Sequence, residues 1–292
     1  MAKKDYVSPS VLSVGIETKW QKGFYGEGIV IAVLDTGCDV MNLDLKDRMI
    51  DGYNFTEEFN GDTNNYGDTN GHGSHVAGII AGSNNNYGIQ GIAPKVSLLI
   101  VKVLNGSGKG SLELLSEGLK YAMNWRGDNN ERVKIISLSL GVRKYDKKLH
   151  DLIKQVDKKG ITVVAAAGND GDGDLTTMEY RYPASFKEVI SVGAIDESIK
   201  NIADFSNSNE YVDVYAPGVN IYSNSLNNEF IEMSGTSMAV PFVAGSLAIL
   251  IEEYEKKATR SISTKEVFEI LMSHTTIEFI EKTMIKSLNL EK

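Results

Sequence analysis

The sequence predicts an α/β protein with a mostly parallel central sheet and helices on both faces. Apolar, β-branched runs occur at 29–35, 97–104, 133–140, 161–168 and 189–195, and helix-like segments such as 111–125 and 146–159 lie between them. This alternation favours a parallel sheet in three layers. The 292 residues are 42% apolar and contain no linker, repeat or low-complexity segment, so one large core in one domain is expected.

The first apolar run, IVIAVLD at 29–35, ends in a carboxylate. A continuous apolar run of this length fits a strand that is buried on both faces of a parallel sheet. Asp35 would then lie at the carboxyl edge of the sheet, where open α/β sheets carry their functional sites.

A histidine between glycines follows in NGHGSHVAG at 70–78. His72 lies in the turn before a helix of small residues, where it is exposed enough to exchange protons. His75 falls inside that helix and is expected to serve packing or a hydrogen bond. An i, i+3 histidine pair also suggests a metal site, but the sequence offers no third nitrogen or sulfur ligand nearby.

A serine precedes the apolar segment 239–251, which is expected to be a buried helix. In GTSMAVP at 235–241, Ser237 would place its hydroxyl and its backbone N–H at the positive end of the helix dipole. The alternative is an ordinary serine N-cap. To act as a nucleophile, Ser237 needs a base and an acid that orients the base, and His72 and Asp35 are the candidates.

The chain order Asp, His, Ser is that of subtilisin. The sequence resembles the subtilisin family of serine proteases, and its intracellular members in particular. The matching motifs are VLDTGCD at 33–39, NGHGSHVAG at 70–78, SLLIVKVL at 97–104, AAGNDGDGD at 166–174 and GTSMAVP at 235–241. The resemblance implies a three-layer subtilisin-like fold and a serine endopeptidase that cleaves peptide or protein substrates through an acyl-enzyme.

One peptidase domain is expected over 1–292, with an N-terminal arm at 1–20. The polar pattern STKEVFEILM predicts a C-terminal helical extension from about 259 to 292. The resemblance to intracellular members also implies that a homodimer is possible.

The resemblance assigns roles to individual residues. Asp35, His72 and Ser237 would be catalytic, and Asn169 would join the Ser237 N–H in an oxyanion hole. Without the resemblance, Asn169 would be a turn residue after Gly168. The implied substrate-binding residues are Gly106, Ser107, Gly108, Ser139, Leu140, Gly141 and Arg181. The segment at 139–141 would pair with an extended peptide as an added strand.

Arg181 falls where the family often has a small residue at the floor of the primary specificity pocket. If its side chain points inward, the pocket is shortened and favours an acidic or small polar P1 residue. If it points outward, the pocket accepts large apolar residues. The stretch GSGKGS at 106–111 could also be interpreted as a phosphate-binding loop. It has neither the spacing G-x-x-x-x-G-K-[ST] nor the spacing G-x-G-x-x-G, so this interpretation is disfavoured.

Calcium is the cofactor that the resemblance implies. Its ligands would be Asp5, Asp44, Ser83, Asn85, Tyr87 and Ile89, and a weaker second cation site would use Ala184, Phe186, Val189 and Asp213. Calcium takes six to eight oxygen ligands, many of them backbone carbonyls. Taken alone, the segment 83–89 would be an asparagine-rich surface loop.

Composition favours the cytoplasm. We find no apolar signal region at the N-terminus and expect no membrane span. The single cysteine, Cys38, allows no intramolecular disulfide. The net charge of −9 argues against nucleic acid as a partner.

The sequence disfavours two alternatives to a protease. A catalytically weak binding module is disfavoured because all the candidate catalytic residues are present. An esterase with a G-x-S-x-G elbow is disfavoured because Ala239 stands where the second glycine would be. Cys38 as nucleophile has no role that Ser237 does not fill better.

Overall fold

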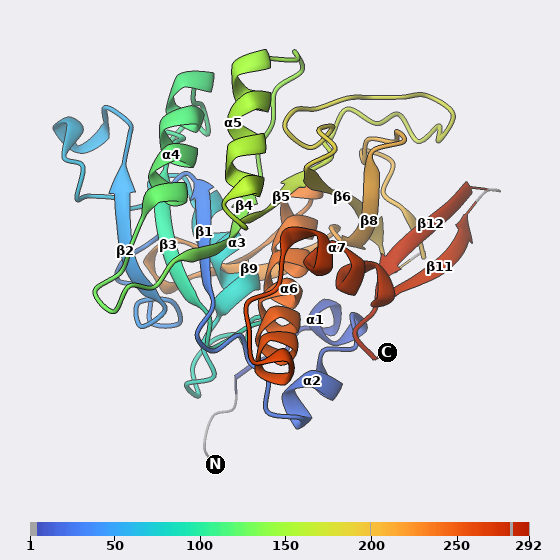
Figure 1. Ribbon diagram of the computed structural model, residues 1–292, viewed down its shortest axis with the longest axis horizontal. Coiled ribbons are helices and arrows are strands. Elements are labelled where there is room, and N and C mark those ends of the chain that lie inside the picture. Colours follow the sequence, from blue (N-terminus) through green and yellow to red (C-terminus); the bar gives the residue numbers. More distant parts are fainter. Residues whose placement is uncertain (1–4, 199, 281–282, 292) are drawn as a thin grey trace.

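The computed structural model describes residues 5–198, 200–280 and 283–291 (Figure 1). Its centre is a ten-stranded sheet with the order β11-β12-β8-β6-β5-β4-β1-β3-β2, in which β7 pairs with β6. The strands of this sheet are β1 (Val30–Asp35), β2 (Met49–Asn54), β3 (Ser97–Lys102), β4 (Val133–Leu138), β5 (Thr162–Ala166), β6 (Val189–Asp196), β7 (Asn201–Ile202), β8 (Val212–Pro217), β11 (Thr275–Ile280) and β12 (Thr283–Leu288). All neighbouring strands from β2 to β12 are parallel along this order, which confirms the predicted fold class.

Helices cover both faces of the sheet (Figure 1). They are α1 (Pro9–Ser13), α2 (Glu17–Gln21), α3 (His72–Ala81), α4 (Leu112–Asn124), α5 (Lys147–Lys158), α6 (Thr236–Ala258) and α7 (Thr264–Ser273). Short turns of 3-10 helix lie at Glu58–Gly61 and Leu226–Asn228, and a separate hairpin pairs β9 (Ile221–Asn224) with β10 (Phe230–Met233).

The central strands are buried on both faces, as their apolar sequences predict. In β1, Ile31 and Val33 pack into the core that includes α3 and α6, whereas Ala32 and Leu34 pack into the core that includes α4 and α5. Alternate side chains of a strand point to opposite faces, so one continuous apolar run supplies both cores.

Helix α6 runs through one of these cores. In the described part of the chain, it is the one helix with the length and apolar composition of a membrane span, but 94% of that apolar window is buried inside the protein. This agrees with the expectation that 239–251 forms a buried helix.

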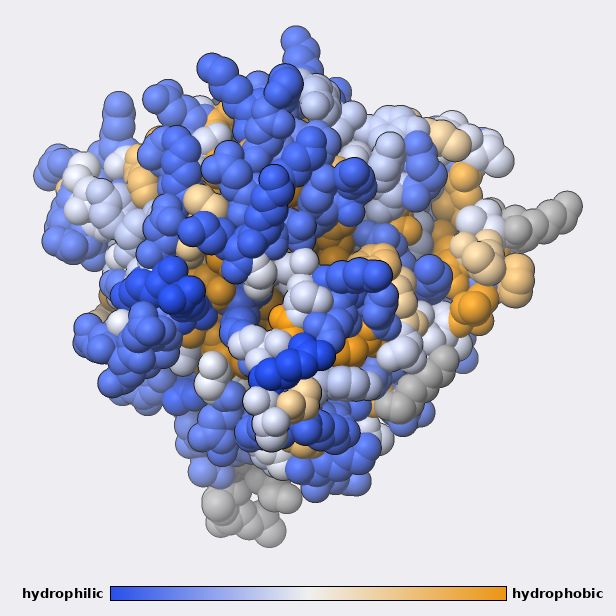
Figure 2. Space-filling model, in the orientation of Figure 1, coloured by the Kyte–Doolittle hydropathy of each residue, from blue (hydrophilic) through white to orange (hydrophobic). Residues whose placement is uncertain are grey.

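The C-terminal region corrects one expectation. Helix α7 forms, and Ser263 and Glu266 cap it reciprocally, but the helical extension expected to 292 is wrong beyond Ser273. The runs TTIEFI and TMIKSL are rich in β-branched residues and form the antiparallel hairpin β11–β12, which extends the sheet beside β8. Figure 2 shows apolar side chains at this edge of the molecule, where Ile277, Phe279 and Met284 are exposed.

Candidate active site

Asp35 is the last residue of β1, at the carboxyl edge of the sheet as predicted, and its side chain is buried. Oδ1 accepts hydrogen bonds from the Thr36 N–H at 2.7 Å and from His72 Nδ1 at 2.7 Å. Oδ2 is buried without a hydrogen-bond partner among the described residues. The carboxylate therefore has one close titratable partner, which is the His72 ring.

Glycines bring His72 to this carboxylate. The histidine begins α3 directly after Gly71, whose φ of 100° is in the left-handed region that glycine adopts without strain. A Cβ at Gly73 would lie 2.1 Å from the backbone oxygen of Gly37, so only glycine lets the start of α3 approach the turn that follows Asp35. The glycine-rich pattern around His72 thus has a steric cause.

The environment of His72 suits a base. Burial lowers its pKa, but the Asp35 carboxylate and its hydrogen bond outweigh burial and raise the pKa above the ordinary 6.5. Because Nδ1 faces Asp35, Nε2 is the ring nitrogen left for other partners. The side chain is 25% exposed, and it lines a cleft of about 500 Å³.

Ser237 lies in the first turn of α6, as the sequence predicts. The Ser237 hydroxyl donates a hydrogen bond to the Ser139 backbone oxygen at 3.0 Å. The Ser139 hydroxyl in turn donates to the Ser237 backbone oxygen at 2.8 Å. Ser237 lines a smaller cavity of about 200 Å³. Leu140 and Gly141 line both this cavity and the His72 cleft, so the two spaces share a wall.

Asn169 presents its amide nitrogen beside Ser237. Its Oδ1 accepts hydrogen bonds from the Thr236 N–H at 2.9 Å and from the Thr236 hydroxyl at 2.8 Å, which fixes the orientation of the amide. A Cβ at Gly235 would lie 3.2 Å from Asn169 Nδ2 and 3.7 Å from the Ser237 nitrogen. Two N–H donors therefore flank a space that stays open because residue 235 is glycine.

The predicted substrate-binding residues are only partly brought together. Gly108, Ser139, Leu140 and Gly141 line the larger cleft. Leu140 and Gly141 follow β4 and pair with no other described strand, so their backbone groups are free for an added strand. Gly106 and Ser107 lie outside both cavity linings, and Gly106 instead bonds to Glu58 and Asn70.

Arg181 lines the smaller cavity together with Asn169 and Ser237. Its guanidinium is held by Asp170 through Nε and through Nη2, the latter at 2.7 Å. Arg143 Nη2 contacts the same carboxylate at 2.6 Å. Asp170 is not among the residues predicted from the sequence, although its position directly after Asn169 is a usable signal.

The remaining histidine and the cysteine of this region are structural. His75 is fully buried, its Nε2 lies 2.9 Å from the Ile221 oxygen, and burial lowers its pKa to about 4. Cys38 is buried, and burial raises the pKa of its thiol, which disfavours the nucleophilic thiolate. In the described ranges, no group of three or more His, Cys, Asp or Glu side chains is arranged to hold a metal ion.

The predicted calcium ligands do gather around the loop at 83–89. The Asp5 carboxylate accepts hydrogen bonds from the backbone N–H groups of Asn85 and Tyr87, at 3.2 and 2.9 Å. Asp44 Oδ2 accepts from the Ile89 N–H at 3.0 Å, while its Oδ1 is buried without a partner among the described residues. Burial raises the pKa of Asp44 to about 6. This orphaned carboxylate oxygen in an oxygen-rich loop fits a calcium ion.

The second predicted cation site is less complete. Asp213 accepts a hydrogen bond from the Ser191 N–H at 3.0 Å, and the Phe186 carbonyl accepts from the Val189 N–H at 3.0 Å. No hydrogen bond recorded within the described ranges joins Asp213 to Ala184. This site stays a prediction.

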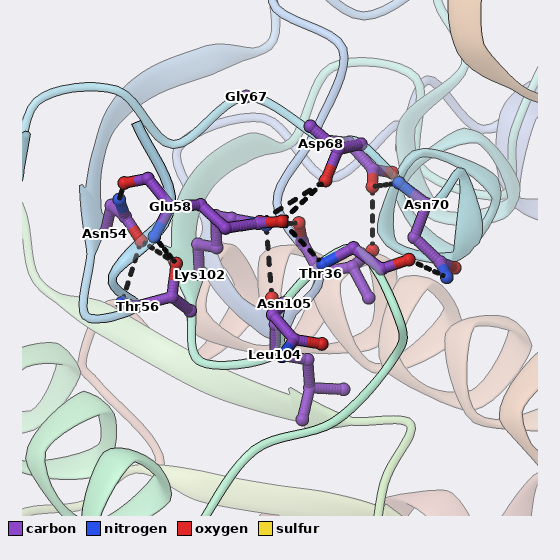
Figure 3. A network of polar contacts seen from close by, with 12 residues as sticks. Thr36, Asn54, Thr56, Glu58, Gly67, Asp68, Asn70, Lys102, Leu104 and Asn105 are labelled. Carbon is purple, nitrogen blue, oxygen red and sulfur yellow. Dashed lines mark hydrogen bonds and ion pairs between the residues drawn. The ribbon is translucent and has the colours of Figure 1, made fainter. Parts of the chain in front are cut away.

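A polar network behind the cleft was not foreseen (Figure 3). Lys102 forms an ion pair with Glu58 at 2.7 Å, and Asp68 accepts hydrogen bonds from the Thr36 hydroxyl and the Gly71 N–H, both at 2.9 Å. The signal for Lys102 was available, because it is a lone lysine within the apolar run SLLIVKVL.

An acid in contact with a base, and a serine with N–H donors in an adjoining cavity, are the groups that acyl transfer by a serine hydrolase requires. Comparison with known proteins narrows this class. The model of the subtilase family matches residues 26–288. The chain belongs to this family and is a subtilisin-like serine protease.

Three relatives illustrate the similarity. The chain is 44% identical over 266 residues to the major intracellular serine protease of Bacillus subtilis (strain 168). The aligned region covers 91% of this chain and 81% of that relative. It is 44% identical over 250 residues to an intracellular serine protease of Paenibacillus polymyxa, covering 86% and 74%. It is 38% identical over 234 residues to subtilisin DY of Bacillus licheniformis, covering 80% of each.

Proposed function

We propose that the chain is an endopeptidase that hydrolyses peptide bonds through Asp35, His72 and Ser237. The observation that supports this most is the 2.7 Å contact between Asp35 Oδ1 and His72 Nδ1, which leaves Nε2 as the ring nitrogen that can act as the base. The cleft that His72 lines shares Leu140 and Gly141 with the cavity that Ser237 lines.

In the acylation step, the Ser237 hydroxyl turns from the Ser139 oxygen to His72 Nε2. Oγ then bonds to the scissile carbonyl carbon, and its proton moves to Nε2. Asp35 stabilises the imidazolium, and the N–H donors of Asn169 and Ser237 receive the oxyanion. The C–N bond breaks, the amine takes the proton from Nε2, and the acyl group stays on Oγ.

Deacylation reverses these roles. A water molecule gives its proton to His72 Nε2 while its oxygen bonds to the acyl carbon. The C–O bond to Ser237 then breaks, and Oγ recovers the proton. The net reaction consumes one water and releases an acid and an amine.

We also propose that the cavity lined by Arg181 receives the P1 side chain. Arg181 and Arg143 surround the single carboxylate of Asp170, so this cluster carries one excess positive charge. An acidic or small polar P1 residue suits that charge. Profiling a peptide library with the wild type and Arg181→Gly tests the assignment, and identical P1 preferences in the two enzymes would refute it.

We propose calcium at the loop at 83–89, held by Asp5, Asp44, Asn85 and backbone carbonyls. The ion would neutralise the clustered carboxylates and tie the N-terminal arm, which pairs through Tyr6 with Ile89, to the body of the protein. We further propose an intracellular location, because two of the relatives are named intracellular serine proteases, and cell fractionation would test it.

The function is tested with a fluorophosphonate probe and casein on the wild type and Ser237→Ala. Labelling with casein cleavage, both lost in the variant, is expected. Labelling without cleavage would favour an esterase. Absence of both in the folded wild type would favour a binding module.

A further inference from the structure

We propose that Glu58 and Lys102 form a positioning ion pair that holds one wall of the substrate cleft against the Asp35–His72 edge of the sheet. This inference rests on the proposed function, because it concerns the same cleft. Neither residue is recorded in contact with the Asp35 carboxylate, the His72 ring or Ser237, so the pair acts through other groups.

Lys102 ends β3, and its side chain is fully buried. Its ammonium donates to the Thr36 oxygen at 2.5 Å and to the Leu104 oxygen at 3.1 Å, and it pairs with Glu58 Oε2 at 2.7 Å (Figure 3). Three acceptors match the three protons of a lysine. Among the residues that the structure describes, Glu58 is the one carboxylate that pairs with this buried charge.

Glu58 extends the pair to two further segments. Its Oε1 accepts the Gly106 N–H at 2.9 Å and the Thr69 hydroxyl at 3.2 Å. The Gly106 oxygen in turn accepts from Asn70 Nδ2 at 2.9 Å. A Cβ at Gly106 would lie 2.9 Å from Glu58 Oε1, so the loop is closely packed against this carboxylate.

The charge state of Glu58 supports a persistent ion pair. Partial burial raises its pKa, but the hydrogen bonds from Lys102 and the Gly106 N–H outweigh burial and leave the pKa below the ordinary value. Glu58 is therefore ionised in the neutral range. The turn that carries it includes Phe59 at a φ of 57°, a conformation that costs energy for a non-glycine residue and needs such contacts to persist.

Together the two side chains join three segments of the site. Thr36 follows Asp35, Thr69 and Asn70 precede His72, and Leu104 with Gly106 begins the loop whose continuation at 108–112 lines the cleft. Removing one partner of such a pair leaves a buried charge uncompensated. The loop at 104–110 would then shift relative to the opposite wall at 139–142.

The expected defect is in binding extended substrates rather than in bond cleavage. We compare Glu58→Gln and Glu58→Ala, using a single-residue nitrophenyl ester and a tetrapeptide nitroanilide with the same P1 residue. Glu58→Gln removes the charge but keeps an acceptor for Gly106, whereas Glu58→Ala removes both. KM for the tetrapeptide should rise about tenfold in Gln and more in Ala, while kcat and the ester kinetics change less than about twofold.

The matched control is Glu117→Gln, which removes the exposed ion pair with Lys120 on α4. This variant should leave KM and kcat unchanged for both substrates. Lys102→Met should resemble Glu58→Ala, and combining Lys102→Met with Glu58→Gln should restore part of the tetrapeptide KM because no buried charge is left unpaired. Circular dichroism confirms that each variant is folded.

Two results would overturn the proposal. One is an equal loss on ester and tetrapeptide in folded Glu58→Gln, which indicates a general structural role. The other is an unchanged tetrapeptide KM in both Glu58 variants. Failure of the proposed function looks different, since the wild type itself would then hydrolyse neither substrate.

Discussion

Asp35 and Lys102 are register partners at the ends of the adjacent parallel strands β1 and β3. The Asp35 carboxylate binds the His72 ring, and the Lys102 ammonium binds the Thr36 oxygen and pairs with Glu58. One end of a strand pair thus supplies both the acid that orients the base and the cation that holds the surrounding loops.

The pH dependence of activity should report His72. Because Asp35 raises the pKa of His72, kcat/KM should increase with pH to a midpoint above 6.5 as the imidazolium loses its proton.

Asp35→Asn should lower kcat by about 10⁴-fold, because the wrong tautomer of His72 is then favoured. Steady-state rates between pH 5 and 9 measure both effects, and a flat wild-type profile from pH 5 to 8 argues against this base.

The oxyanion donors can be probed separately. Asn169→Ala should lower kcat by about 10²–10³-fold with little change in KM, because the donor acts mainly in the transition state. Gly235→Ala places a methyl group in the space between Asn169 Nδ2 and the Ser237 nitrogen and should also lower kcat. An unchanged kcat in folded Asn169→Ala would exclude this donor.

The buried His75 should make stability depend on pH. Its folded-state pKa of about 4 lies below the unfolded value of about 6.5, so its contribution is present above pH 6.5 and is lost as pH falls towards 4. The loss attributable to His75 is about 3 kcal/mol over that window. Urea unfolding of the wild type and His75→Asn at several pH values measures it, and equal slopes in both would contradict the assignment.

Chelation should lower the melting temperature if calcium occupies the loop at 83–89. Asp44→Asn should weaken this chelator sensitivity, because the orphaned Oδ1 then carries less charge for the ion. A matched control is Asp151→Asn, which alters an exposed residue of α5. Thermal unfolding with and without excess chelator decides the matter, and no shift in the wild type would count against structural calcium.

The features that the sequence predicts correctly are those in which a local residue pattern is imposed by the packing of the whole fold. The apolar run of β1 requires cover on both faces. Beside His72, Gly71 is required by its positive φ and Gly73 by the close approach to Gly37. The hairpin β11–β12 was missed because period-two patterns in short polar segments are weak beside the clear helix of α7. The Glu58–Lys102 pair was missed because its partners lie 44 positions apart and meet only through tertiary packing.

The most direct test of the account is to identify the acylated residue. The wild type is mixed with a nitrophenyl ester, quenched in acid during the burst and analysed by peptide mass spectrometry. The account predicts one acyl group on Ser237, and neither acyl-enzyme nor casein cleavage in Ser237→Ala. Acylation at another residue, or cleavage of casein by folded Ser237→Ala, would contradict it.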